Sequence, residues 1–511
     1  MGDMSLNLSP QVPSIPHMDD KTKIDVRYMV VAPYVSIHIY WNPKISEVVY
    51  EVEEPILNKE DESNLRRIEQ AMREILSINM LNIENTEEGL LDHIDKTARL
   101  IISELGISIE EPTYNKIYYY LYRDFIGFNQ IDAMMRDYYI EDIECNGVGE
   151  PLYLIHRVFR NLKTNVLFKE MDVLSSFVEK LAQKTGRYIS YASPILDGSL
   201  PDGSRVNATY TKDITSKGPT FTIRKFTKTP WTPVQLLGFH TISPEMLAYF
   251  WVLMEYQANF MIVGGTASGK TTLLNAVAFF IPSEDRVVSI EDTRELNLPR
   301  ENWLPSVVRT GIAGADTGNV DMFALLRGSF RQNPDYVIVG EVRGREASVL
   351  FQGMASGHAS ISTMHADSVE ALIRRLETPP INLSPMLVNS LDAVVIMTHA
   401  IVGKKETRRL REIVEIVKVE ADGTAITNTP FKWNPADDKF YYNKDSKVFD
   451  KLSDKLGIPL EKLQREFEIR SKLIYTLYKN RILGYDEVSK IIKEYNKSPE
   501  RVLKRFGLIN A

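Results

Sequence analysis

The first half of the chain mixes strand-like and helix-like spacing of its hydrophobic positions. β-Forming residues cluster in 28–41 and 48–52, which predicts a hairpin. Apolar residues then recur at helical intervals over 65–76 and 90–102, which predicts two amphipathic helices. A tyrosine-rich helix is expected over 114–139, and short strands separated by Asn-Gly and Asp-Gly turns follow it. This mixture predicts an α+β domain in two parts.

The second half changes to alternating strands and helices, which is typical of an α/β domain with a parallel sheet. Two prolines and a tryptophan between Lys228 and Pro233 mark the linker. The first 23 residues are rich in Pro, Ser and Asp and are predicted to be disordered. The predicted parts are a disordered N-terminus (1–23), N-terminal subdomains 1 (24–111) and 2 (112–227), a linker (228–240), an α/β core (241–430) and a helical C-terminal part (431–511).

A glycine-rich loop follows the apolar strand 260–263 and precedes the helical run 272–280. Residues 264–271 match G-x-x-x-x-G-K-T, the sequence of a P-loop in its required context of strand and helix. Glycines let backbone N–H groups surround the phosphates, and the helix N-terminus favours their negative charge. Lys270 adds a cation, and Thr271 adds a hydroxyl for Mg²⁺. The predicted nucleotide-binding residues are Gly265, Thr266, Ala267, Ser268, Gly269, Lys270, Thr271 and Thr272.

Polar residues end three further apolar strands. Glu341 comes just after strand 336–339, although the usual Walker B acid is replaced by Gly340. Glu291 ends another strand, and His365 follows a third. Carboxyl ends of parallel strands line the ligand crevice of an α/β sheet. We expect Glu341 to activate water, Glu291 to assist at Mg²⁺, and His365 to sense the γ-phosphate.

Composition places the chain among ordinary globular proteins, with 511 residues, 44% hydrophobic and 25% charged. Its only cysteine, Cys145, excludes intrachain disulfides and zinc sites built on paired cysteines, so no zinc is expected. The start of the chain does not resemble a signal peptide, and apolar stretches such as 393–402 are too short to cross a bilayer. A cytoplasmic protein is expected.

The formal net charge of −7 argues against nucleic-acid binding by the chain as a whole. Residues 1–110 carry an excess of acidic side chains, and residues 451–511 carry an excess of basic ones. The two regions can attract each other within one chain, between copies, or toward anionic lipid. They are equally consistent with two solvated helical surfaces.

Together these motifs resemble one family. The P-loop is followed in order by the acidic box 290–295, the Val-Gly-Glu-Val-Arg strand end at 339–343 and the histidine box 357–367. This order is similar to the secretion-ATPase superfamily of type II and type IV secretion, pilus assembly and the archaellum. The four-cysteine zinc motif of many bacterial members cannot form here. The pattern is most similar to the archaeal branch, and within it to the archaellum motor ATPase.

The resemblance implies more than the spacing can show. Such proteins are homohexamers with a two-part α+β N-terminal domain and a RecA-like C-terminal P-loop domain. They hydrolyse Mg²⁺-bound ATP and drive a polytopic membrane platform protein at the cytoplasmic face of the membrane, together with accessory cytosolic motor proteins. Carried over by motif, Glu341 is the catalytic carboxylate and Glu291 assists metal or water. Arg205 and Arg224 match N-domain arginines that reach the nucleotide, within one subunit or from a neighbour.

Other functions remain open at this point. Pilus assembly and type II or type IV protein secretion share the same chemistry, so the motifs cannot separate them from archaellum assembly or rotation. A nucleic-acid translocase is disfavoured because no run of basic residues with interleaved aromatics accompanies the P-loop. A scaffold that binds nucleotide without turnover is disfavoured by Lys270, Glu291 and Glu341 being present together.

Overall fold

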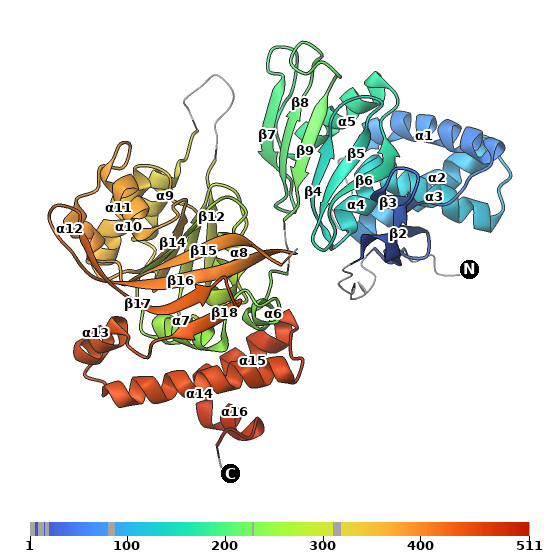
Figure 1. The fold of residues 1–511 in the computed structure, drawn as a ribbon. Coiled ribbons are helices and arrows are strands. Elements are labelled where there is room, and N and C mark those ends of the chain that lie inside the picture. The colour runs from blue at the N-terminus through green and yellow to red at the C-terminus, as the bar shows by residue number, and fades with distance from the viewer. Residues whose placement is uncertain are drawn as a thin grey trace. The chain divides into compact units, whose positions relative to one another are not determined.

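The computed structural model divides the chain into two compact units, residues 1–226 and 227–511 (Figure 1). The structure describes residues 6–8, 15, 20–79, 87–226, 229–309, 318–403 and 405–509. No helix within these ranges is long and apolar enough to cross a membrane.

The first unit is built on one mixed sheet, to which the described residues contribute nine strands in the order β1-β2-β3-β6-β5-β4-β9-β8-β7. The predicted hairpin is a three-stranded meander, and its last strand pairs in parallel with β6. The two predicted subdomains therefore share one sheet. The strands are β1 (Asp25–Val31), β2 (Val35–Asn42), β3 (Glu47–Glu53), β4 (Ile140–Cys145), β5 (Pro151–His156), β6 (Arg160–Leu167), β7 (Ile195–Ser199), β8 (Arg205–Thr209) and β9 (Thr220–Arg224).

Helices of the first unit pack into a small core of their own. Ile68 and Met72 of the first predicted helix (65–76) belong to one buried cluster with Ile94 of the second (90–102) and with Tyr118. The predicted long tyrosine-rich helix is instead two helices; in the turn between them, Asp132 Oδ1 accepts from the Phe128 amide at 3.0 Å and packs closely against Gly127. The helices are α1 (Lys59–Asn79), α2 (Glu87–Glu104), α3 (Glu111–Phe125), α4 (Asp132–Arg136) and α5 (Met171–Lys184), with 3₁₀ turns η1 (Lys21–Lys23) and η3 (Asn129–Ile131).

Most of the N-terminal stretch predicted to be disordered lies outside the described residues. The described Asn7 forms a β-bridge with Ala32, with both N···O distances at 3.1 Å. The Ile15 amide donates to the Tyr139 hydroxyl at 3.2 Å. The polar composition of the stretch did not predict these contacts with the folded unit.

The second unit has a RecA-like α/β fold. Its described strands run in the order β12-β11-β13-β14-β10-β15-β16-β17-β18. The pairings from β12 to β15 are parallel, and those from β15 to β18 are antiparallel. The strands are β10 (Phe260–Gly264), β11 (Val287–Glu291), β12 (Trp303–Val307), β13 (Tyr336–Val339), β14 (Ala359–Met364), β15 (Ala393–Val402), β16 (Lys405–Val419), β17 (Ala425–Asn434) and β18 (Lys439–Tyr442).

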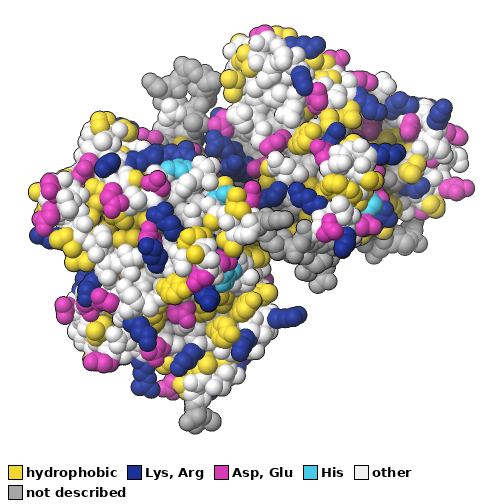
Figure 2. Space-filling view, viewed as in Figure 1, with side chains coloured by type: hydrophobic (Ala, Val, Ile, Leu, Met, Phe, Trp, Pro, Cys, Tyr) yellow, Lys and Arg dark blue, Asp and Glu magenta, His cyan; other side chains and the backbone are white. Residues whose placement is uncertain are grey.

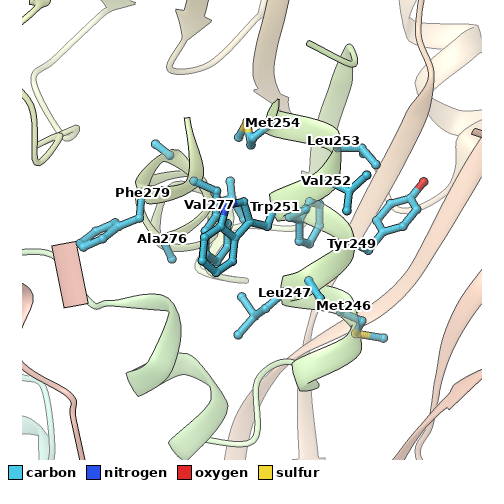
Figure 3. Packing of buried hydrophobic residues seen from close by; sticks show 14 of the residues in the cluster. Met246, Leu247, Tyr249, Trp251, Val252, Leu253, Met254, Ala276, Val277 and Phe279 are labelled. Atoms are coloured by element: carbon cyan, nitrogen blue, oxygen red, sulfur yellow. The ribbon is translucent and has the colours of Figure 1, made fainter. Parts of the chain in front are cut away.

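One face of this sheet is covered by a large apolar core around α7, whose side chains meet those of α8 (Figure 3). Trp251 stacks on Phe280 with ring centroids 5.0 Å apart. The helices of the unit are α6 (Pro233–Gly238), α7 (Pro244–Glu255), α8 (Lys270–Val277), the 3₁₀ turn η4 (Ala278–Phe280), α9 (Met322–Ser329), α10 (Glu346–Ala355), α11 (Val369–Glu377), α12 (Pro385–Val388), α13 (Lys447–Leu456), α14 (Leu460–Lys479), α15 (Tyr485–Lys497) and α16 (Pro499–Arg505).

Two segments outside the predicted α/β core (241–430) belong to the same apolar cluster. Helix α6 lies within the predicted linker, where Thr232 and Gln235 form a capping box and Val234 and Leu236 are buried. The C-terminal helices also contribute, and Arg470 of α14 lies over the rings of Trp251 and Tyr495 and pairs with Glu255. The second unit is therefore larger than the predicted core.

Candidate nucleotide-binding site

The P-loop connects β10 to α8 through backbone conformations that its small residues allow. Gly269 has φ +94° and caps α8, and Ala267 has φ +57°, a region that residues with a Cβ rarely adopt. A Cβ at Gly264 would lie 2.5 Å from the Met397 carbonyl oxygen of β15. The glycines are required here by local geometry as well as by the approach of a phosphate.

Lys270 is buried at the first position of α8, with 8% of its surface exposed. Its Nζ donates to the carbonyl oxygens of Gly264 and Gly265 at 3.0 and 2.8 Å. The same nitrogen lies 3.4 Å from Nδ1 of His365. Burial lowers the pKa of the Lys270 ammonium group, and the nearby Glu341 carboxylate opposes that shift. The lysine is a cation held in place by backbone oxygens.

Glu341 lies just beyond β13 and is contacted from two sides. Arg343 Nη2 donates to Oε2 at 2.6 Å, and His365 Nε2 lies 3.1 Å from Oε1. Partial burial acts to raise the pKa of the Glu341 carboxyl group. The Arg343 hydrogen bond and the charges around it outweigh burial and hold that pKa below its ordinary value. Glu341 is therefore a carboxylate at neutral pH, the form that a general base needs.

His365 lies between the P-loop lysine and Glu341. Burial and the Lys270 charge lower the pKa of its imidazole, so the ring is neutral at neutral pH. If Nδ1 accepts from Lys270, the ring proton is on Nε2, which faces Glu341. The neutral imidazole of His365, at the end of β14, thus links the P-loop lysine to Glu341 at the end of β13.

Glu291 occupies the space that the missing Walker B acid leaves. A Cβ on Gly340 would lie 3.1 Å from Glu291 Cγ, so a side chain at 340 competes with Glu291 for one position. Glu291 is 2% exposed, and its Oε1 accepts hydrogen bonds from the amides of Glu295 and Leu296 at 2.8 and 2.9 Å. Burial raises the pKa of its carboxyl group to about 7.

The buried Oε2 of Glu291 accepts no hydrogen bond from any described residue, and Oε1 of Glu341 has only His365 Nε2 near it, at 3.1 Å. Buried acceptors of this kind normally have a partner. Magnesium in a P-loop site takes one or two protein oxygens besides phosphate and water. Glu291 and the partly buried hydroxyl-bearing Thr271 fit that requirement. Within the described ranges no cluster of three or more His, Cys, Asp or Glu side chains provides a metal cage of its own.

Sequence reasoning missed the side chains that hold these loops. Glu346 accepts from the amides of Arg343 and Gly344, both at 2.7 Å, and so fixes the turn after Glu341. Thr363 Oγ1 donates to the Gly340 carbonyl at 2.7 Å. Arg408 and Arg411 of β16 donate to backbone carbonyls beside the P-loop and His365. For Arg408 and Arg411, the only signal in the sequence is the concentration of arginines at 408–411, in a stretch whose residues favour a β-strand.

Arg205 and Arg224 lie side by side in the first unit, on the paired strands β8 and β9. Arg205 binds Asp197 with N···O 3.0 Å, and Arg224 binds Asp142 at 3.2 Å. Both side chains are exposed, at 41% and 67%. Their role at a nucleotide remains a prediction.

The P-loop, the polar ends of β11, β13 and β14, and the strand order define a P-loop nucleotide-binding protein of the RecA-like α/β class. Residues 152–428, more than half of the chain, match the family described as type II/IV secretion system protein. The chain belongs to this family, as the order of its motifs predicted.

The chain is also similar to individual proteins. The uncharacterized protein MJ0900 of Methanocaldococcus jannaschii is 36% identical over 412 residues, which are 80% of this chain and 73% of that protein. The type IV secretion system protein PtlH of Bordetella pertussis is 31% identical over 306 residues, covering 54% of this chain and 89% of PtlH. Among solved structures, the Legionella pneumophila ATPase DotB is 16% identical with a TM-score of 0.42, covering 72% of this chain and 95% of DotB.

Proposed function

We propose that the chain is a magnesium-dependent ATPase whose reaction takes place where the P-loop meets Glu291, Glu341 and His365. The observation that carries the proposal is the contact of His365 with both Lys270 and Glu341, at 3.4 and 3.1 Å, together with the buried Glu291 Oε2, which accepts no hydrogen bond from the described residues. Glu341 follows β13 and Glu291 ends β11, adjacent strands that lie two and three places from the P-loop strand β10 in the sheet. A carboxylate oxygen of this kind can accept a hydrogen bond from water or coordinate a hydrated cation.

Each residue then has a distinct task. Lys270 and the N-terminus of α8 bind the phosphates and stabilise charge on the transferring group. Glu341 accepts a proton from the water that attacks the γ-phosphorus, and cleavage of the bond to the bridging oxygen releases ADP and phosphate. When bound, Mg²⁺ neutralises phosphate charge, with the Thr271 hydroxyl and Glu291 as its protein ligands. Neutral His365, in contact with Lys270 and Glu341, is proposed to sense the γ-phosphate.

We further propose that the ATPase works as a homohexameric motor at the cytoplasmic face of a membrane. Arg205 and Arg224, two exposed cations on adjacent strands, are proposed to complete the nucleotide site within a subunit or across a subunit boundary. The motor would drive assembly or rotation of an archaellum or type IV pilus-like filament through a membrane platform protein. Protein export is the second candidate, and the similarity to PtlH favours it.

A nucleic-acid translocase is a distant alternative. Figure 2 shows acidic side chains interspersed among the basic ones on the visible face, which gives little support to a continuous cationic track for nucleic acid. The net charge of −7 points the same way.

Turnover by the purified full chain tests the proposal. Phosphate release from ATP should require Mg²⁺, stop in EDTA, continue with a zinc-selective chelator and disappear in Lys270→Ala. Addition of single- or double-stranded DNA should leave the rate unchanged. Absence of turnover at any protein concentration would contradict the ATPase proposal, and strong stimulation by DNA would favour the translocase. Co-purification of a polytopic membrane protein with the chain from its native cell would identify the driven system.

A further inference from the structure

Strand β16 supplies arginines to two separate loops of the nucleotide site. Arg408 Nε donates to the Ala267 carbonyl oxygen in the P-loop at 2.9 Å. Arg411 Nη2 donates to the Asp367 carbonyl oxygen, two residues after His365, at 2.8 Å. Both acceptors are main-chain atoms, so the contacts constrain loop geometry and do not depend on the side chains at 267 or 367.

We infer that Arg408 and Arg411 are positioning residues of the nucleotide site, with Arg408 holding the P-loop turn and Arg411 holding the turn that presents His365. The inference rests on the proposed ATPase function and adds a strand that carries none of the recognised nucleotide motifs.

The Arg408 contact lies where the P-loop is most strained. Ala267 has φ +57°, a conformation that costs free energy unless the surroundings impose it. The Arg408 Cδ lies 3.4 Å from the position that a Cβ on Gly269 would take, so the arginine also lies against the residue that caps α8. Holding the Ala267 carbonyl outward keeps the loop amides available for phosphate.

A bulge in β16 accounts for the position of Arg411. Met397 of β15 pairs with Leu410 while Ile396 pairs with Glu412, so Arg411 is the extra residue of the register shift. Bulges next to active sites commonly redirect a side chain. The neighbouring Glu412 accepts from Arg411 Nη2 at 2.8 Å and orients the guanidinium. A second arginine, Arg375 of α11, donates to the His365 carbonyl at 3.1 Å, so the histidine turn is held at both ends.

The strand that carries these arginines is itself well anchored. Arg409, 4% exposed, makes a two-point contact with Asp438 at 2.9 and 3.0 Å. The fully buried Glu415 accepts from the Tyr249 hydroxyl at 2.8 Å and from the Lys447 amide at 2.7 Å. These contacts fix β16, and a positioning residue requires a rigid element to hold its side chain in place.

The two roles predict different kinetic defects. Loss of the P-loop support weakens nucleotide binding in ground and transition states alike, so Arg408→Ala should raise KM and the Kd of a fluorescent ATP analogue about 10-fold with kcat within twofold. Loss of the His365 support acts on the reacting end of the site, so Arg411→Ala should lower kcat about 10-fold with Kd within twofold. Each Arg→Lys variant, which keeps a donor, should recover most of the loss. Lys418→Ala, on the same strand but paired with Glu420 at the surface, is the matched control.

The experiment uses the full chain, with thermal melting of every variant to establish folding. NMR titration of His365 adds a readout that needs no turnover: Arg411→Ala should shift its imidazole signals and Arg408→Ala should not. A Kd change below twofold in Arg408→Ala, or equal effects of both alanine variants on Kd and kcat, would overturn the inference. If the wild type binds nucleotide without hydrolysing it, the ATPase proposal fails. The Kd and NMR measurements still test whether Arg408 and Arg411 position the site.

Discussion

Glu291 packs so closely against Gly340 that a Cβ on residue 340 would lie 3.1 Å from Glu291 Cγ, and the Glu291 side chain would have to shift. We propose that Glu291, at the end of the neighbouring strand β11, takes the place of the acid that usually ends a Walker B strand. Glycine at 340 leaves the Glu291 side chain the room that it occupies.

Substitution Gly340→Ala should force Glu291 to shift and should lower kcat roughly 10- to 100-fold. The expected contact is tight but not prohibitive, so the variant should fold and bind nucleotide. Gly328→Ala in α9 is the matched control, because a Cβ there meets no atom within 4 Å. Steady-state turnover and a binding titration of both variants check the prediction, which fails if Gly340→Ala turns over like Gly328→Ala.

Glu291 should make the stability of the apo protein depend on pH. Burial raises the pKa of its carboxyl group to about 7, so between its ordinary pKa near 4.5 and 7 the folded chain holds a proton that the unfolded chain releases. Raising pH across that window therefore favours unfolding, by up to roughly 3 kcal/mol. Glu291→Gln removes this loss and should be more stable than wild type at pH 8 but not at pH 4.

Urea unfolding in EDTA without nucleotide measures the difference at both pH values. The exposed Glu370→Gln on α11 serves as the control and should follow wild type. A wild-type to Glu291→Gln difference that is the same at pH 4 and pH 8 would show that Glu291 does not titrate in this window.

Arg470 should be one of the most sensitive positions of the C-terminal helices. It is 3% exposed, lies over Trp251 and Tyr495 and pairs with Glu255. Its removal leaves a cavity beside the two rings and deletes the ion pair with Glu255, whose side chain is 39% exposed, so Arg470→Ala should cost about 2–4 kcal/mol in unfolding free energy, mainly from lost packing. Arg465→Ala, an exposed arginine on the same helix, should change it by about 0.5 kcal/mol or less. Equal effects would mean that α14 packs differently.

Assembly can be tested by mixing two inactive variants. If Arg224 acts at a neighbour's nucleotide, subunits with Lys270→Ala and subunits with Arg224→Ala should regain part of the activity when mixed, because some sites then contain both intact residues. Each variant alone should remain inactive. No recovery, together with a specific rate that does not depend on protein concentration, would place the complete site within one chain.

The parts of the site that depend on short sequence motifs could be predicted. The P-loop and the polar ends of β11, β13 and β14 each depend on a few consecutive residues, and parallel pairing brings the strand ends to one edge. Arg408 and Arg411 were not predictable, because their contacts depend on the β15–β16 register and its bulge.

Long-range pairing explains the other differences. The parallel contact of β3 with β6, which joins the two predicted N-terminal subdomains into one sheet, links residues more than a hundred positions apart. Helix α6 was missed because Pro233 read as a linker residue, although proline is also favoured at the first turn of a helix.

The central claim is that Glu341 activates the water that attacks bound ATP. The direct measurement compares wild type with Glu341→Gln in single-turnover hydrolysis and in binding of a fluorescent ATP analogue, with Glu370→Gln as the control. The substitution keeps size and removes only the base, so the rate should fall roughly 10²- to 10⁴-fold while Kd stays within a few-fold. A Glu341→Gln rate equal to that of wild type, at saturating Mg²⁺ and ATP, would contradict the account.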